Sequence, residues 1–181
     1  ADWGGTSKSI WLLLNEAATP WEFSKPIREE AHKLGMDFVS SPFEVAAVDH
    51  LEEIGGVEAY KIASMEITDM LLLRKVGSMK RPVIVSAGIA SKADIQVAIN
   101  ELKKAGAGPI ALLKCTSAYP ATFAQANLVT LRDFANSCPN CTLGLSDHTL
   151  GHVAPVVAVV MGARVIAKQS TMRRSDGGPD T

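Results

Sequence analysis

Six short apolar runs recur along the chain, and most are rich in β-branched residues. Each is short and continuous, as is typical of a strand buried on both faces of a parallel sheet. The runs span residues 37–41, 59–64, 82–88, 110–117, 142–148 and 164–170. Consecutive runs are separated by the length of one helix and its loops. This repeat predicts an α/β fold built from βα units, with parallel strands and right-handed crossovers.

The segments between the runs have the spacing of amphipathic helices. Helices are predicted within residues 25–35, 43–56, 91–106 and 152–163. In the third, Ser91 is in the position of an N-cap with Asp94 three residues later, and Gly106 marks the end. In the fourth, Pro155 is compatible with a helix only near its first turn. These signals support the alternation of strands and helices.

Two architectures fit this alternation, a doubly wound open sheet and a (β/α)8 barrel. A glycine-rich phosphate loop after the first strand would favour the open sheet, and no such loop follows any run. Polar residues instead end nearly every run, and in a barrel these ends meet at one mouth. Six runs are two fewer than a closed barrel needs. We therefore expect an incomplete TIM barrel of about six βα units.

The strand-end residues are rich in small hydroxyls and lysines, which suits a phosphorylated or polyhydroxylated ligand. Serines and threonines at these positions are equally compatible with helix caps. Lysine is more informative, because Lys61 and Lys168 lie within apolar runs and are costly to bury without a charged partner. An anionic ligand would account for at least one of them.

The run 142–148 ends in Asp147 and His148, and three interpretations stay open at this point. The pair could be a metal ligand with an orienting acid, a general acid–base pair, or a cap beside a buried histidine. Cys115 lies in a strand and is expected to pack, or to face the barrel, as a small hydrophobic residue. Cys138 and Cys141 form a CxxC motif that we interpret as two loop thiols, since no second pair completes a zinc site.

Composition narrows the class of protein further. The chain has 181 residues, is 47% hydrophobic and carries a formal charge of -1 with scattered basic residues, which argues for one domain and against a nucleic-acid partner. The longest apolar run, 153–163, is too short to cross a membrane. The N-terminus lacks the order of a signal peptide. We therefore expect a cytoplasmic protein.

Several blocks together resemble one family, the phosphoenolpyruvate-condensing synthases of nonulosonic acids. These enzymes include N-acetylneuraminate (sialic acid) synthase and its pseudaminic and legionaminic acid relatives. The similar blocks are TPWEF (19–23), SSPFEVAAVDHLEE (40–53), AYKIASMEITD (59–69), RPVIVSAGIAS (81–91), ALLKCTSAYPA (111–121), NLVTLRDF (127–134), GLSDHTLGHVAPVVAVVMGA (144–163) and SDGGPD (175–180). Their forms are most similar to the pseudaminic acid branch.

The resemblance implies a (β/α)8 barrel followed by a small antifreeze-like domain. Residues 1–181 are similar to strands three to eight of that barrel, so the chain is expected to be a partial catalytic domain without the C-terminal domain. In the full-length parent, the resemblance implies a homodimer in which the small domain of one subunit closes over the active site of the other.

The resemblance also implies a reaction and a set of site residues. Phosphoenolpyruvate is joined to an open-chain N-acylated hexose, and a divalent metal, Mn or Mg, polarises the aldehyde. Tyr119 matches a residue near the acceptor sugar, His148 the first metal-binding histidine, and Asp147 an acid beside it, so Asp147 and His148 are the catalytic candidates. Positions that contact phosphoenolpyruvate are matched by Ser41, Lys61, Ser64, Ser86, Ser117 and Ser146.

The chain departs from the family pattern in its last strand. The family has Glu-Lys-His-Phe-Thr, whereas this chain has Ala167 to Thr171, so that Gln169 replaces the second metal-binding histidine. A glutamine carbonyl is a harder and weaker ligand than imidazole, acceptable for magnesium and poor for zinc. Two alternatives follow: a non-catalytic barrel that keeps an anion pocket, and a related synthase that condenses phosphoenolpyruvate with phosphosugars.

Overall fold

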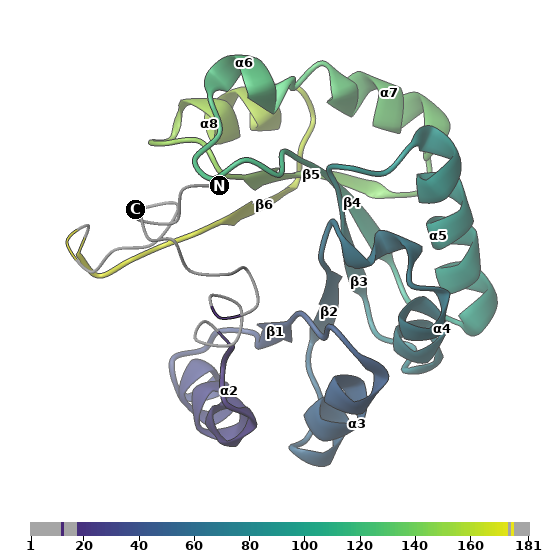
Figure 1. Ribbon diagram of the computed structural model, residues 1–181, viewed down its shortest axis with the longest axis vertical. Helices are drawn as coiled ribbons and strands as arrows, with labels where there is room; N and C mark the ends of the chain where they lie inside the picture. The colour runs from purple at the N-terminus through teal and green to yellow at the C-terminus, as the bar shows by residue number, and fades with distance from the viewer. Residues whose placement is uncertain (1–11, 13–17, 174, 176–181) are drawn as a thin grey trace.

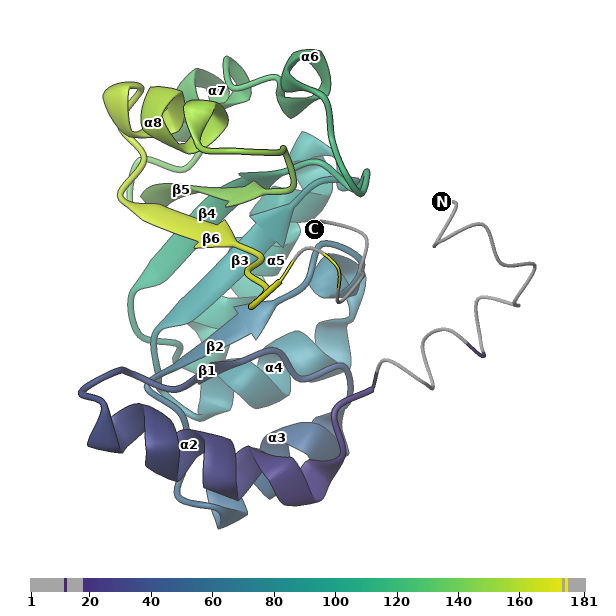
Figure 2. The same cartoon turned by 90° about the vertical axis from the view of Figure 1, so that its left-hand side faces the viewer.

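The structure, a computed structural model, describes residues 12, 18–173 and 175 (Figure 1). These residues form a six-stranded sheet in which every neighbouring pair is parallel and the strand order follows the chain order. The strands are β1 (Val39–Ser40), β2 (Ala59–Ile62), β3 (Val83–Ala87), β4 (Ile110–Cys115), β5 (Thr142–Asp147) and β6 (Val165–Lys168). The sheet curls into a half-barrel, which confirms the predicted fold class (Figures 1 and 2).

The helices lie on the outer, convex side of the curled sheet (Figure 1). They are η1 (Trp21–Phe23), α2 (Ser24–Lys33), α3 (Val45–Glu53), η2 (Glu66–Thr68), α4 (Met70–Ser78), α5 (Lys92–Ala105), α6 (Phe123–Ala126), α7 (Thr130–Ser137) and α8 (Val153–Val160). None of the described helices is long and apolar enough to span a membrane. The inner, concave side of the sheet carries no helix among the described residues.

Local sequence signals set the ends of these helices. Ser91 caps α5 through a capping box, in which its hydroxyl oxygen accepts from the Asp94 backbone N–H and the Asp94 side chain accepts from the Ser91 N–H. Gly106 ends α5 with φ of 102°, a left-handed conformation that favours glycine. Pro155 lies in the first turn of α8. The helix limits predicted at these three positions are confirmed.

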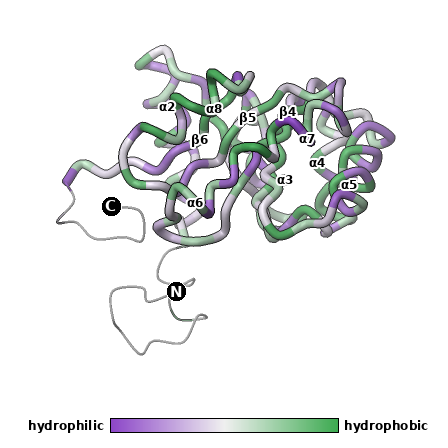
Figure 3. Tube along the Cα trace, turned by 90° about the horizontal axis from the view of Figure 1, so that it is seen from above, coloured by the Kyte–Doolittle hydropathy of each residue, from purple (hydrophilic) through white to green (hydrophobic). Residues whose placement is uncertain are grey.

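The main hydrophobic core lies between β2–β4 and the helices that cover them. Strand alternation sends Tyr60 and Ile62 of β2 into this core, where both are fully buried, and turns Lys61 toward the concave side. A smaller cluster joins β5 to α8 through Leu145, Ala154 and Ala158. Figure 3 shows hydrophilic and hydrophobic colours alternating around α5, as expected for a helix with one buried face.

The concave side is tightly packed near its base. A Cβ atom placed on Gly144 of β5 would lie 2.5 Å from the Val165 carbonyl oxygen and 2.8 Å from Cγ of Leu113. Only glycine therefore fits between these neighbours. Toward the carboxyl ends of the strands the inward residues become smaller and polar, and this change opens the concave side into a pocket.

Some predictions differ from the structure or are not tested by it. β1 is limited to two residues, whereas residues 37–41 were predicted as a strand. The block at 175–180 lies outside the described residues except for Ser175. The N-terminal residues, for which no signal peptide was predicted, also lie outside them, with the exception of Leu12.

Candidate functional site

A pocket of about 410 Å³ lies at the carboxyl ends of the strands. Residues of β2 to β6 line it, together with the loop after β1 and the segment that follows β6. The predicted site residues that it brings together are Ser41, Lys61, Ser64, Ser86, Tyr119, Ser146, Asp147, His148 and Gln169. The barrel-mouth argument thus correctly grouped residues that lie more than a hundred positions apart in the sequence.

Lys61 presents a cation to this pocket without a partner of opposite charge. Its side chain is half-buried and makes no hydrogen bond or ion pair with any described residue. Burial lowers the pKa of the Lys61 ammonium group, while the nearby Cys115 has the opposite, smaller effect. A half-buried ammonium group surrounded by hydroxyls is a favourable position for an anion.

Two serines line the same pocket as Lys61 and differ in their hydrogen bonding. Ser86 on β3 is 1% exposed, and its hydroxyl has no hydrogen-bond partner among the described residues. Ser64 is also buried, but its Oγ accepts hydrogen bonds from the backbone N–H groups of Gly88 at 2.9 Å and Ile89 at 3.3 Å. Buried hydroxyls are nearly always paired, so the unpaired Ser86 hydroxyl indicates a ligand position in this pocket.

Ser117 is the one predicted site residue that does not line the pocket directly. Its side chain is exposed, and it is absent from the residues that line the pocket. A Cβ atom on Gly88 would approach Oγ of Ser64 to 2.7 Å and Oγ of Ser117 to 2.9 Å. Gly88 therefore allows the two serines to lie close together at the rim.

His148 contacts two side chains from other parts of the chain. Its ring lies 4.1 Å from the Tyr119 ring, centroid to centroid, with an interplanar angle of 59°. It also hydrogen-bonds to the Cys115 thiol. Burial raises the pKa of that thiol, but hydrogen bonds to His148 and Ser146, together with the charges of His148 and Lys61, more than offset this effect, so the net pKa is below the usual value.

Asp147 lines the pocket, and both oxygens of its carboxylate accept hydrogen bonds from the protein. Oδ1 accepts hydrogen bonds from the backbone N–H and the hydroxyl of Thr149, at 3.0 and 2.9 Å. Oδ2 accepts from Nζ of Lys168 at 2.6 Å. The second of the two lysines predicted to need a charged partner therefore has one, whereas Lys61 does not.

The predicted metal ligands, His148 and Gln169, both line the pocket. Within the part of the chain that the structure describes, no group of three or more His, Cys, Asp or Glu side chains is arranged to hold a metal ion. One imidazole and one amide carbonyl suit a hard divalent ion that keeps water or substrate oxygens as its other ligands. They do not form the closed four-ligand set that structural zinc prefers.

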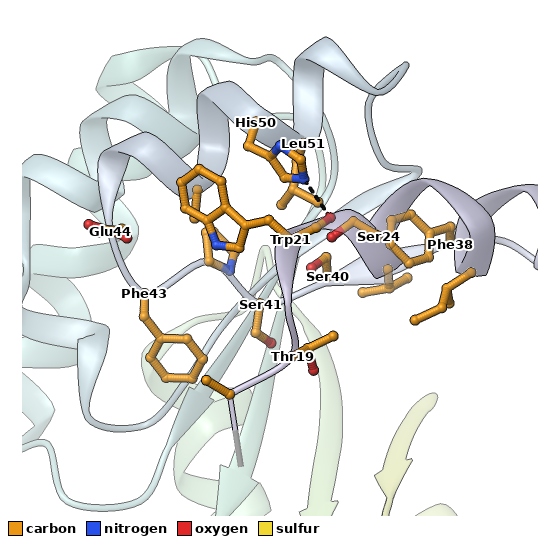
Figure 4. A pocket seen from close by; sticks show the side chains of 15 residues that line it. Thr19, Trp21, Ser24, Phe38, Ser40, Ser41, Phe43, Glu44, His50 and Leu51 are labelled. Carbon is orange, nitrogen blue, oxygen red and sulfur yellow. Dashed lines mark hydrogen bonds between the residues drawn. The ribbon is translucent and has the colours of Figure 1, made fainter. Parts of the chain in front are cut away.

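A second pocket, of about 510 Å³, lies between η1, α2, β1 and α3 (Figure 4). Trp21 stacks on His50 with ring centroids 4.8 Å apart, and Nε2 of His50 donates to the Trp21 carbonyl oxygen at 3.1 Å. Ser41 and Phe43 line both pockets. None of the predicted catalytic or metal residues lies in this second pocket.

Sequence reasoning missed Phe43, which lines the pocket, and Thr149, which donates to Asp147. Cys115 was expected to pack or to face the barrel as a small hydrophobic residue, and it is buried and lines the pocket. Cys115 pairs in register with Ser146, a relationship that only the structure shows.

The sequence model of the NeuB family matches residues 2–181. The chain belongs to the NeuB family. It is 36% identical over 174 residues to the pseudaminic acid synthase of Helicobacter pylori, covering 96% of this chain and 51% of that protein. It is 38% identical over 152 residues to the N,N'-diacetyllegionaminic acid synthase of Campylobacter jejuni, covering 83% and 45%.

A NeuB-type fold is also found among solved structures. The N-acetylneuraminic acid synthetase of Leptospira borgpetersenii, solved in complex with citrate, superposes with a TM-score of 0.88 at 33% identity. The match covers 97% of this chain and 61% of that one. The family resemblance read from the sequence blocks is thereby confirmed. The chain spans about half the length of the curated NeuB relatives that it matches.

Proposed function

We propose that the 410 Å³ pocket binds phosphoenolpyruvate and that the protein condenses it with an open-chain N-acylated amino sugar. The product would be a nonulosonic acid, with pseudaminic acid as the first candidate because of the sequence blocks and the Helicobacter relative. One observation carries the proposal. Within the part of the chain that the structure describes, neither the Lys61 ammonium group nor the Ser86 hydroxyl has a partner, and both line the same pocket, where a phosphate or carboxylate group would satisfy both.

The proposed reaction forms one carbon–carbon bond and breaks one carbon–oxygen bond. The methylene carbon of phosphoenolpyruvate bonds to the aldehyde carbon of the sugar, and the aldehyde oxygen takes up a proton to become a hydroxyl. Water adds to the central carbon of phosphoenolpyruvate. Inorganic phosphate then leaves with the bridging oxygen, and the central carbon becomes a ketone. The pocket must therefore hold two anionic groups and place an aldehyde beside them.

Different side chains of the pocket are suited to bind the anion, to contact the sugar and to transfer a proton. Lys61, Ser64, Ser86 and Ser146 would bind the anion, with Ser41 and Ser117 at the rim. Tyr119, whose ring packs on His148, would contact the acceptor sugar. His148 is available to move a proton or to bind a metal ion. Asp147 is fully hydrogen-bonded, so its contribution would be to hold its neighbours in place.

A divalent ion, Mg²⁺ or Mn²⁺, is the proposed cofactor. His148 and Gln169 would hold it, and when bound it would polarise the aldehyde carbonyl as a Lewis acid. The harder donor set favours these ions over zinc. A homodimer and a cytoplasmic location remain predictions from the sequence.

Release of inorganic phosphate tests the proposed function directly. The full-length protein is incubated with phosphoenolpyruvate, with and without an N-acylated hexosamine and with and without Mn²⁺. We expect phosphate only when both additions are present. Phosphate release that ignores the sugar would contradict the proposal, and the same assay with Lys61→Met should show a large loss.

A second candidate is a non-catalytic protein that keeps the anion pocket, and Gln169 and Ala167 favour it because the family has histidine and glutamate there. Phosphate and phosphoenolpyruvate would then bind, but no phosphate would be released under any condition. The third candidate, a phosphosugar synthase, needs a further free cation for the sugar phosphate. Among the described pocket residues the other lysine, Lys168, is already paired with Asp147.

A further inference from the structure

The geometry points to Lys168, through its ion pair with Asp147, as a positioning residue for His148 and Gln169. We call the Lys168 ammonium group, the Asp147 carboxylate and Thr149, which are joined by hydrogen bonds, the clamp. The inference deepens the proposed function, because it concerns the same pocket. It assigns neither Lys168 nor Asp147 a contact with substrate.

The clamp joins two strands at their carboxyl ends. Asp147 and Lys168 are partners in register on β5 and β6, and Nζ of Lys168 lies 2.6 Å from Oδ2 of Asp147. The same ammonium group donates to the Thr149 carbonyl oxygen at 2.7 Å. One cation therefore fixes both the end of β5 and the turn that follows it.

The clamp also holds the residues directly before and after His148, Asp147 and Thr149. Asp147 accepts from the N–H and the hydroxyl of Thr149, which closes a turn with His148 at its centre. The backbone of His148 is tied again by the Ala121 N–H, which donates to the His148 carbonyl oxygen at 2.8 Å. With its backbone fixed at both neighbours, the imidazole has little freedom except rotation of its side chain.

The second proposed metal donor is placed by the same ion pair. Gln169 directly follows Lys168, just as His148 directly follows Asp147, and both line the pocket. Pairing of Asp147 with Lys168 in register therefore brings the next residues of the two strands to the same level. A slip between β5 and β6 would separate the two donors.

Burial makes the ion pair essential to this geometry. The Asp147 side chain is 1% exposed and the Lys168 side chain 33% exposed. Removal of the ammonium group would leave a buried carboxylate with only Thr149 as donor, and the turn would rearrange to solvate it. The sequence had suggested an anionic ligand as a possible partner of Lys168, but the partner in the structure is Asp147 of the same chain.

Three variants and a matched control test this role, with a fourth, milder variant in reserve. Lys168→Met removes the charge at similar length, Asp147→Asn removes the opposite charge, and Lys168→Arg keeps the cation as the conservative rescue. Lys92→Met is the matched control, because it removes the same charge from an exposed pair with Asp133 at 3.4 Å. Thr149→Val, which removes only one of the clamp's hydrogen bonds, is the milder variant if Lys168→Met fails to fold.

The first readout is independent of catalysis. In protein labelled with ¹⁵N-histidine, the imidazole resonances of His148 should shift in Lys168→Met and Asp147→Asn. They should return toward wild type in Lys168→Arg. The resonances of His32, His50 and His152 should not move. An unchanged His148 resonance in folded Lys168→Met protein would overturn the inference, whatever the protein catalyses.

The second readout separates the two ligands. We expect Lys168→Met to weaken Mn²⁺ binding about 10-fold or more, as for supporting residues of metal sites. Binding of inorganic phosphate at Lys61 should stay within about twofold of wild type. Equal losses of both would indicate general disruption and contradict the inference. If wild-type protein binds neither probe, the proposed function fails, and the histidine resonances still decide the role of the clamp.

Discussion

Nζ of Lys168 lies 2.6 Å from the Asp147 carboxylate, in register across β5 and β6. The two lysines that lie within apolar runs, Lys61 and Lys168, therefore differ in their partners. Lys168 has an internal partner, and Lys61 has none among the described residues. The distinction assigns the anion site to Lys61 and a positioning role to Lys168.

Replacement of Lys61 by methionine should stabilise the protein while it removes the anion site. The unpaired, half-buried ammonium group is unfavourable in the absence of ligand, and methionine fills similar space without charge. We expect the free energy of unfolding to rise by about 0.5–2 kcal/mol, measured by urea denaturation without phosphate present. The exposed Lys92→Met is the control and should change stability little. A clear loss of stability in Lys61→Met would show that the ammonium group has an internal partner.

The stabilising effect of Lys61→Met should depend on pH with a defined sign. Burial lowers the folded-state pKa of Lys61 below 10.5, its ordinary value in an unfolded chain. Between these two pKa values the unfolded chain binds more protons, so this lysine makes wild-type stability rise with pH. The advantage of Lys61→Met over wild type should therefore shrink as the pH rises from neutral toward 10.5. An advantage that grows with pH would contradict the assigned environment.

Ser86→Ala should separate ligand binding from stability. The Ser86 hydroxyl is buried and has no hydrogen-bond partner in the described residues, so its removal should leave the unfolding free energy unchanged or raise it by up to about 1 kcal/mol. Anion affinity should fall about 5–10-fold, because one hydrogen bond to a charged ligand is lost. Titration calorimetry with phosphoenolpyruvate measures the affinity, with the exposed Ser137→Ala as control. Unchanged affinity would place the ligand away from β3.

Gly88→Ala should disturb the rim of the pocket through Ser64. The added methyl group would lie 2.7 Å from the Ser64 oxygen, which accepts the Gly88 N–H. We expect a loss of about 1–3 kcal/mol in thermal unfolding, as for overpacking. The double variant Gly88→Ala with Ser64→Ala should recover part of this loss, since the colliding oxygen is gone. Strictly additive losses would show that the two residues are not in contact.

The overall fold was predictable because its signals are local and repeated. Each βα unit has an apolar run and an amphipathic helix, and the capping box at Ser91 and the glycine at 106 mark one helix without ambiguity. β1 was harder, because it keeps only Val39 and Ser40 in the ladder although the apolar pattern runs over five residues. Pairing with a neighbouring strand, rather than the pattern of the strand itself, decides such a length.

The site was predictable in its membership but not in its pairings. Strand ends of parallel strands meet at one mouth, so Ser41, Ser86 and Ser146 could be grouped before their distances were known. Which lysine has a partner depends on the register of β5 and β6, and which thiol faces the pocket depends on the phase of β4. A one-residue shift in the register of β5 and β6, or in the phase of β4, would change which lysine is paired or which side chain faces the pocket. No local sequence pattern fixes the register or the phase.

Gln169→His should strengthen metal binding at the proposed centre. Imidazole is the stronger donor for Mn²⁺, and Gln169 and His148 line one pocket. We expect affinity for Mn²⁺ to rise by about 10–100-fold, measured by electron paramagnetic resonance of the free ion. His148→Asn in the same background should remove the gain. No change in affinity would favour the non-catalytic anion-binding alternative.

Binding of phosphoenolpyruvate by wild-type protein and by Lys61→Met tests the central claim most directly. Isothermal titration at neutral pH should show one site per chain in the wild type and at least about a 10-fold loss in Lys61→Met, since a charge-assisted contact is removed. Lys168→Met should keep its affinity within about twofold. Equal affinity of wild type and Lys61→Met, or a larger loss in Lys168→Met than in Lys61→Met, would contradict the assignment of the anion site to Lys61.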